Sequence, residues 1–139
     1  MKKLSGVLLI DDDETTNFLN EWLLSKMDLT HNIRVFKNGK QAFDFLYNVS
    51  HHHHEGNHQD YFQPELILLD INMPVMDGFE FLNLYNRLSA DFREKITLAV
   101  LTTSSHPDHT LQTESHSAIY LTKPLTREKI KKLLTKHLA

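Results

Sequence analysis

A fivefold alternation between short apolar runs and longer amphipathic stretches constrains the fold of this chain more than any other feature. Four of the five runs contain four consecutive apolar residues, as in strands that are buried on both faces of a parallel sheet. The predicted strands are 7–10, 33–36, 66–69, 97–101 and 118–121. Because an amphipathic stretch follows each run, the sequence predicts a doubly wound α/β domain with helices on both faces of its sheet.

The amphipathic stretches predict five helices. The first spans 14–27 and carries Phe18, Leu19, Trp22 and Leu23 on one face, so we interpret Trp22 as a core residue. A second helix is predicted within 39–49, and a third begins at Gly78. The fourth, at 107–117, is polar, and Thr126 is predicted to cap the fifth, which turns Ile130, Leu133 and Leu134 toward the core.

Composition excludes several classes of protein. A chain of 139 residues with 40% apolar residues fits one domain with an ordinary core. It has no cysteine, which excludes disulfides, thiol chemistry and cysteine-type zinc sites. The formal charge of −3 gives no broad basic field for nucleic acid, and no apolar run approaches the roughly 20 residues of a membrane span. We therefore expect a cytoplasmic protein that binds neither nucleic acid nor a membrane.

Polar residues follow the predicted strands at their carboxyl ends. They are Asp11, Asp12 and Asp13 after the first strand, Asp70 after the third, Thr102 after the fourth and Lys123 after the fifth. In a parallel sheet these ends meet at one edge, which is where doubly wound folds bind ligands. Crowded carboxylates repel one another, and Mg²⁺ or Mn²⁺ relieves that repulsion. A lysine beside such a metal indicates an anionic ligand, and this combination is typical of phosphoryl transfer.

The segment 66–78, with the sequence LILLDINMPVMDG, closely resembles the phosphorylation motif of response regulator receiver domains. Three further segments, 7–13, 100–102 and 120–124, resemble the other receiver motifs in the same order and at similar spacing. The resemblance implies a stand-alone receiver of the chemotaxis-regulator-like type, used in two-component and phosphorelay systems. It also implies a flavodoxin-like sheet of five parallel strands in the order 2-1-3-4-5 with five helices.

The resemblance implies a role for each matching acidic residue. Asp70 would accept the phosphoryl group and also bind the metal. Asp12 would bind Mg²⁺ directly and Asp11 through water, while the backbone carbonyl of Asn72 would be a further ligand. Mn²⁺ is an alternative ion at the same site.

The remaining motif residues would hold and sense the phosphoryl group. Lys123 would neutralise Asp70 and then bind a phosphoryl oxygen, and Thr102 would bind another. Tyr120 would act with Thr102 as the switch on the output face. Lys123 would precede Pro124 through a cis bond.

Three positions in the resemblance are expected to tune hydrolysis. Asn72 and Ser104 would flank the attacking water. Thr103 stands where receivers commonly have alanine, and we expect its bulk to slow the entry of water.

The resemblance also implies partners. A histidine kinase or a histidine phosphotransfer protein would donate the group, and a separate effector protein would read it. The fourth helix, fifth strand and fifth helix would change conformation, because phosphorylation biases an equilibrium that already exists. The domain would be no enzyme in the ordinary sense but would catalyse its own phosphorylation and dephosphorylation.

A histidine-rich stretch departs from the receiver pattern. His51 to His54 and His58 lie among polar residues, which predicts a solvated loop extension at about 50–63 within a single domain of 1–139. A zinc or nickel site is the alternative, since histidine tracts also bind metals. His106, His109 and His116 are interpreted as surface residues.

Simpler interpretations accompany several of these residues. Asp13 is predicted to cap the first helix, and Lys123 taken alone would fit a solvated turn. The run from Asp11 to Thr15 also fits the Asp-x-Asp-x-Thr motif of haloacid dehalogenase-type phosphatases, with Asp11 as nucleophile and Asp13 as general acid. In that reading the segment from Asp70 to Gly78 has no role. A pseudo-receiver and a transcription factor are further alternatives; the former conflicts with the filled motif positions, and the latter lacks a DNA-binding segment.

Overall fold

The fold is described by a computed structural model that covers residues 3–51, 61–73, 76–103 and 119–138. Its five strands are parallel and have the order β2-β1-β3-β4-β5, which confirms the predicted topology. The strands are β1 (Val7–Ile10), β2 (Ile33–Phe36), β3 (Leu66–Asp70), β4 (Thr97–Thr102) and β5 (Ile119–Thr122). Each strand lies within a residue or two of its predicted range, because the apolar runs set the strand lengths.

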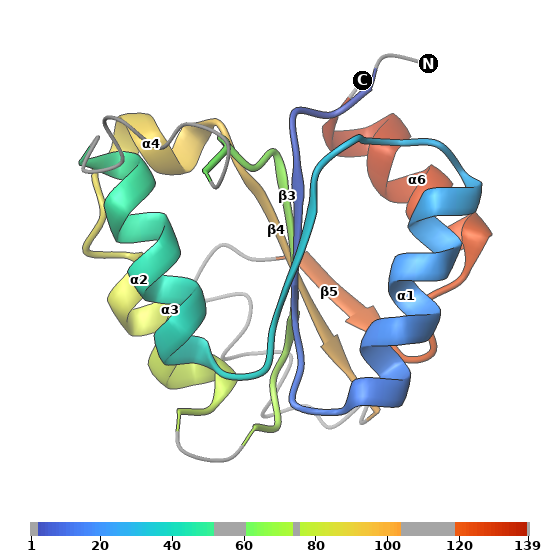
Figure 1. Ribbon diagram of the computed structural model, residues 1–139, viewed down its shortest axis with the longest axis horizontal. Helices are drawn as coiled ribbons and strands as arrows, with labels where there is room; N and C mark the ends of the chain where they lie inside the picture. Colours follow the sequence, from blue (N-terminus) through green and yellow to red (C-terminus); the bar gives the residue numbers. More distant parts are fainter. Residues whose placement is uncertain (1–2, 52–60, 74–75, 104–118, 139) are drawn as a thin grey trace.

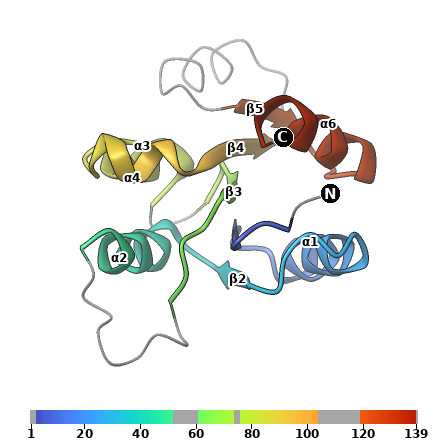
Figure 2. The same ribbon diagram turned by 90° about the horizontal axis from the view of Figure 1, so that it is seen from above.

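Helices cover both faces of the sheet (Figures 1 and 2). They are α1 (Glu14–Lys26), α2 (Gly39–Ser50), α3 (Gly78–Tyr85), α4 (Ala90–Glu94) and α6 (Arg127–His137). In Figure 1 α2, α3 and α4 lie on the left of the sheet, whereas α1 and α6 lie on the right. The result is a three-layer arrangement with the sheet in the middle.

Several predictions concern residues outside the described ranges. These are the helix at 107–117, Ala118 of the fifth strand, Ser104, and the histidines at 52–54, 58, 106, 109 and 116. At the start of the histidine-rich stretch, the structure describes His51 as the C-cap of α2, where its ring stacks on Tyr47.

The core is split by the sheet into two clusters, one beneath each helical layer. The strands β1, β3 and β4 are buried along almost their whole length, whereas the edge strands β2 and β5 are half-buried. Successive side chains on a strand point to opposite faces, so Leu8 and Ile10 belong to one cluster and Val7 and Leu9 to the other. Burial on both faces explains why the inner strands are apolar without interruption.

Side-chain caps fix where the helices begin. Asp13 caps α1 and Thr126 caps α6, as the sequence predicts, by accepting hydrogen bonds from backbone N–H groups. Three caps were not predicted: Asn38 caps α2, Asp77 forms a capping box with Glu80 at the start of α3, and Ser89 caps α4. The helix α4 itself was also missed, because five residues are too few to show a helical period.

The interpretation of Trp22 as a core residue is wrong. Its exposed fraction is 54%, and the neighbouring Phe18 and Leu19 are exposed to 68% and 56%. The side of α1 that packs on the sheet instead carries Asn17, Asn20 and Leu24. Apolar periodicity identifies a helical face but does not say whether that face turns inward.

Candidate functional site

Three carboxylates meet at the carboxyl edge of the sheet, which is the lower edge in Figure 1. Asp11 and Asp12 directly follow β1, and Asp70 is the last residue of β3. One oxygen from each carboxylate lies within 4.8 Å of the others. Asp11 and Asp70 are buried, whereas Asp12 is exposed. The adjacent parallel strands β1 and β3 therefore bring acids 58 to 59 positions apart into one cluster.

Lys123 supplies a positive charge to this cluster from the end of β5. Its Nζ lies 3.0 Å from Oδ2 of Asp11 and 3.2 Å from Oδ1 of Asp70. Burial disfavours the ammonium, but the hydrogen bond and charge of Asp11, together with Asp70, raise the pKa of Lys123 above its usual value. Lys123 thus remains charged and bridges two carboxylates.

The surroundings of Asp70 disfavour the charged form of its carboxyl group. Burial, followed by repulsion from Asp11, raises its pKa from 3.8 to about 6. Lys123 and the backbone N–H of Asn72, 3.3 Å from Oδ1, act in the opposite direction. Any further cation bound at the cluster would favour the charged form, which is the form that attacks an electrophile.

Hydrogen bonds to Asp11 fix the first loop of the site. The backbone N–H of Asp13 donates to Oδ1 of Asp11 over 2.9 Å, and Nδ2 of Asn17 donates to its backbone carbonyl over 2.7 Å. Asn17 was not predicted from the sequence as a residue of the site. The one available signal is a polar residue on the first turn of the helix that follows the acidic run.

Gly78 fixes the loop that follows Asp70. Its N–H donates to the carbonyl of Ile71 over 2.9 Å, so the chain folds back on itself after the acid. A Cβ at this position would lie 2.7 Å from Cα of Ile71, a clash with backbone. Glycine is therefore required here by the close approach of two backbone segments, and α3 starts directly beneath the site.

The other predicted residues lie around this centre. Thr102 is fully buried at the end of β4, and its carbonyl accepts a 2.7 Å hydrogen bond from the N–H of Lys123. Tyr120 is half-buried in β5, paired with Val100, and Thr103 is exposed. The bond between Lys123 and Pro124 is cis, as the resemblance implies.

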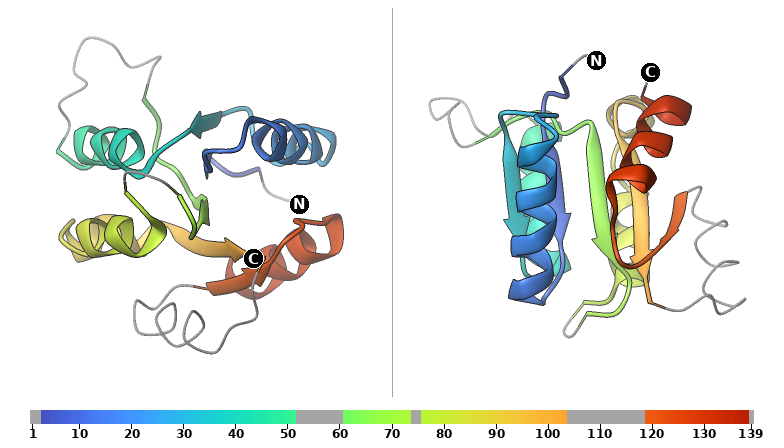
Figure 3. Two further views of the ribbon diagram at one scale, coloured as in Figure 1. Left: turned by 90° about the horizontal axis from the view of Figure 1, so that it is seen from below. Right: turned by 90° about the vertical axis from the view of Figure 1, so that its right-hand side faces the viewer.

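The donor set of the cluster fits a hard divalent cation. All three side chains offer carboxylate oxygens, which are the ligands that Mg²⁺ and Mn²⁺ prefer. The second view in Figure 3 shows the carboxyl ends of the strands at the lower edge, near the start of α1.

Comparison with known proteins identifies relatives along most of the chain. The family model of the response regulator receiver domain matches residues 7–135. The chain is 32% identical to the probable methanogenesis regulatory protein FilR2 of Methanothrix harundinacea over 127 residues, 91% of this chain and 76% of that protein. It is 31% identical to the response regulator Rcp1 of Synechocystis over 118 residues, 84% of this chain and 75% of that protein.

Solved structures extend the likeness to three dimensions. A two-component response regulator from Cytophaga hutchinsonii has a TM-score of 0.82 and 29% identity, with 99% of this chain and 98% of that chain covered. The Mn²⁺-bound form of Rcp1 has a TM-score of 0.70 and 27% identity, with 94% and 88% covered. Both likenesses extend over nearly the whole chain and indicate the same fold.

Proposed function

Because the chain belongs to the response regulator receiver family of two-component systems, we propose that Asp70 accepts a phosphoryl group and that the modified domain signals through other proteins. One observation carries the proposal: Asp70 is a buried carboxylate that shares the ammonium of Lys123 with Asp11, at distances of 3.2 and 3.0 Å. This family consists of signalling domains and not of classical enzymes. We treat 1–139 as a single receiver domain with a histidine-rich extension.

Asp11, Asp12 and Asp70 would hold Mg²⁺, or Mn²⁺ in its place, with Asp12 and Asp70 as direct side-chain ligands and Asp11 acting through water. The backbone carbonyl of Asn72 would complete the protein ligands. The bound ion would neutralise charge on the phosphoryl oxygens as they approach three carboxylates. The mutual proximity of the three carboxylates supports this assignment.

In the transfer step a carboxylate oxygen of Asp70 attacks phosphorus. The bond between phosphorus and the histidine nitrogen of the donor breaks, and the departing imidazole takes up a proton. An acyl phosphate forms on Asp70, and Lys123 binds one of its oxygens. Water later attacks phosphorus in line, which releases phosphate and restores the carboxylate.

Thr102 and Tyr120 would transmit the change. The Thr102 hydroxyl would turn to a phosphoryl oxygen, and Tyr120 would move into the space that it leaves. Asn72, Thr103 and Ser104 would set the rate of hydrolysis, with Thr103 slowing the entry of water. If the half-life of the acyl phosphate were unchanged in Thr103→Ala, this last role would be wrong.

A histidine kinase or a histidine phosphotransfer protein would deliver the group, and an effector protein would bind the modified domain. A groove of about 250 Å³ connects α1 to the site and is lined by Thr16, Leu19, Asn20, Lys123, Pro124 and Leu125. We propose that the donor docks on this groove and on the exposed apolar face of α1. None of the described helices is long and apolar enough to cross a membrane. We propose a cytoplasmic location, with neither nucleic acid nor a membrane as a partner.

The phosphatase alternative is weaker on chemical grounds. Asp13, its general acid, accepts hydrogen bonds from the hydroxyl and backbone N–H of Thr16, which lower the pKa of its carboxyl. A carboxyl whose pKa is lowered is a poor proton donor near neutral pH.

Intact mass measured after incubation with acetyl phosphate or phosphoramidate and Mg²⁺ tests the proposal. We expect the mass gain of one phosphoryl group, lost in Asp70→Asn and after chelation of the metal. The matched control Asp44→Asn removes an exposed carboxylate from α2 and should react like the wild type. A wild-type protein that stays unmodified with both donors would contradict the proposal.

A further inference from the structure

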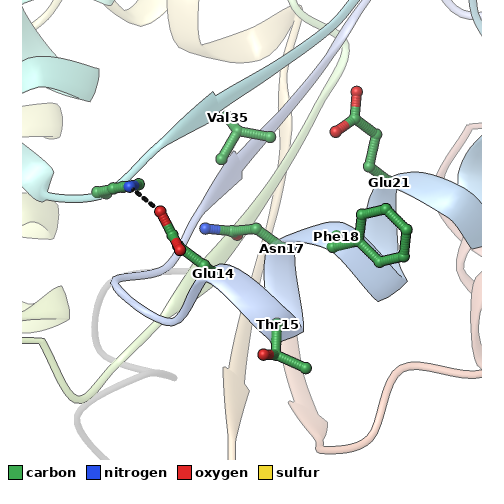
Figure 4. Close-up of a pocket in the computed structure, with 7 residues that line it drawn as sticks. Glu14, Thr15, Asn17, Phe18, Glu21 and Val35 are labelled. Carbon is green, nitrogen blue, oxygen red and sulfur yellow. Dashed lines mark hydrogen bonds and ion pairs between the residues drawn. The ribbon is translucent and has the colours of Figure 1, made fainter.

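A second groove lies on the other side of α1, between this helix and the edge strand β2 (Figure 4). It has a volume of about 500 Å³ and is open to solvent. Phe18 and Val35 form its apolar walls, and Phe18 exposes 68% of its surface. The groove is separate from the phosphorylation site proposed above and from the groove beside Lys123.

The charges around this groove do not balance. Glu14 and Glu21 line it from α1, and Lys37 lines it from the loop after β2. Lys37 forms an ion pair with Glu14. Within the described part of the chain, Glu21 makes no ion pair. The groove therefore carries one net negative charge, located at the Glu21 end.

An unpaired acceptor adds to this negative charge. The side chain of Asn17 lines the groove, and its Oδ1 is buried without a hydrogen-bond partner. The amide is oriented unambiguously, because Nδ2 must be the atom that donates to the carbonyl of Asp11. Because this oxygen is buried, its partial negative charge is only weakly screened by water.

The spacing of these features fits one long basic side chain. Glu14 and Glu21 are two helical turns apart, about 10 Å along the helix, and Phe18 lies between them. An arginine stem can lie against Phe18 and Val35 while its guanidinium reaches Glu21. The flat guanidinium also packs well on an aromatic ring, which a lysine ammonium does less well.

We propose that the groove between α1 and β2 binds an arginine side chain of the protein that docks on α1. This inference rests on the proposed function, since it assumes a protein donor at the exposed face of Phe18, Leu19 and Trp22. That apolar face is continuous with the groove through Phe18. An open groove holds a free ligand weakly, so a side chain carried by a docked protein is the occupant that fits. The groove would then help to select the donor.

The test is an NMR titration of the full ¹⁵N-labelled chain with N-acetyl-L-arginine amide, with N-acetyl-L-citrulline amide as the neutral isostere. We expect the arginine compound to shift the amide resonances around Phe18, Glu21 and Val35 in a saturable way. Citrulline should leave them in place. In Glu21→Gln the apparent affinity should fall about two- to fivefold, the range for an exposed ion pair. Equal shifts with citrulline, or shifts confined to Asp11–Asp13, would overturn the proposal.

A matched variant and a second readout separate this inference from the proposed function. Glu94→Gln removes an exposed carboxylate from α4, on the opposite face of the sheet, and should bind the arginine compound like the wild type. An affinity in Glu94→Gln as low as in Glu21→Gln would mean non-specific attraction and would overturn the inference. Phosphorylation of Asp70 by acetyl phosphate should be the same in Glu21→Gln and the wild type. Loss of that reaction in the wild type would contradict the proposed function but leave arginine binding measurable.

Discussion

The helices α3 and α1 are both amphipathic, yet they sit on the sheet in opposite senses. α3 turns its apolar residues inward, and Phe81 and Leu82 are almost fully buried. α1 turns Asn17 and Asn20 inward and leaves Phe18, Leu19 and Trp22 largely exposed. α3 stabilises the domain through its apolar face, whereas α1 leaves an apolar face exposed to solvent, as surfaces that bind other proteins do.

The polar inner side of α1 has a local cause. Asn17 lies beneath the loop that carries Asp11 and donates a hydrogen bond to its backbone carbonyl. A leucine there would fill space but leave that carbonyl without this donor. The inner side of α1 is therefore determined by the hydrogen bond to the site, whereas the inner side of α3 is determined mainly by packing in the core.

The largest effect on stability is expected when a core residue of α3 is truncated. Phe81→Ala removes a fully buried ring from the core and should lower the free energy of unfolding by about 3–5 kcal/mol. Urea denaturation followed by circular dichroism measures this. A loss below about 1 kcal/mol would contradict the inference that the apolar face of α3 stabilises the domain.

The next effect concerns the charge at the site. Because folding raises the pKa of Asp70 from 3.8 to about 6, the folded state binds the proton more tightly than the unfolded state. The free energy of unfolding should therefore fall as pH rises from about 4 to 6, by up to about 3 kcal/mol for this group.

Asp70→Asn removes the titrating carboxyl and should be more stable than the wild type at pH 7 without metal. Denaturation at several pH values in the presence of a chelator checks this. If the wild type and Asp70→Asn had the same free energy of unfolding at pH 4 and also at pH 7, the burial and repulsion inferred for Asp70 would be contradicted.

A smaller effect is expected for the polar inner side of α1. Asn17→Ala removes the hydrogen bond to the Asp11 carbonyl and should cost about 1 kcal/mol. Asn83→Ala, an exposed position on α3, is the matched control and should change stability by less than about 0.5 kcal/mol. If both variants unfold at the same urea concentration, Asn17 does not support the loop.

The smallest effect on stability is expected on the outer face of α1. Trp22→Ala should change the free energy of unfolding by no more than about 0.5 kcal/mol, because the ring is 54% exposed. The same variant should slow phosphorylation by a protein donor but not by acetyl phosphate. A stability loss as large as that of Phe81→Ala would mean that Trp22 packs in the core, and it would contradict the difference inferred between α1 and α3.

The sequence predicted the sheet and the meeting of the acidic residues for the same physical reason. Buried parallel strands need uninterrupted apolar runs, and parallel strands bring their carboxyl ends to one edge. The strand pattern was therefore sufficient to predict that Asp11, Asp70 and Lys123, from three distant segments, lie close together, as the structure shows.

The orientation of α1 was not predictable from its apolar pattern alone. The pattern of Phe18, Leu19 and Trp22 defines one face, and the spacing of Asn17, Asn20 and Leu24 defines another. Choosing between them requires knowing which groups the helix meets beneath it. The orphaned oxygen of Asn17 and the charge imbalance at Glu21 likewise depend on contacts between α1 and the strands.

Identification of the modified residue decides between Asp70 and Asp11 as the phosphoryl acceptor. The protein is incubated with acetyl phosphate and Mg²⁺, reduced with borohydride, which converts an aspartyl phosphate to homoserine, and mapped by peptide mass spectrometry. We expect homoserine at position 70 and nowhere else. Homoserine at position 11 with an intact Asp70 would contradict it and favour the phosphatase chemistry instead.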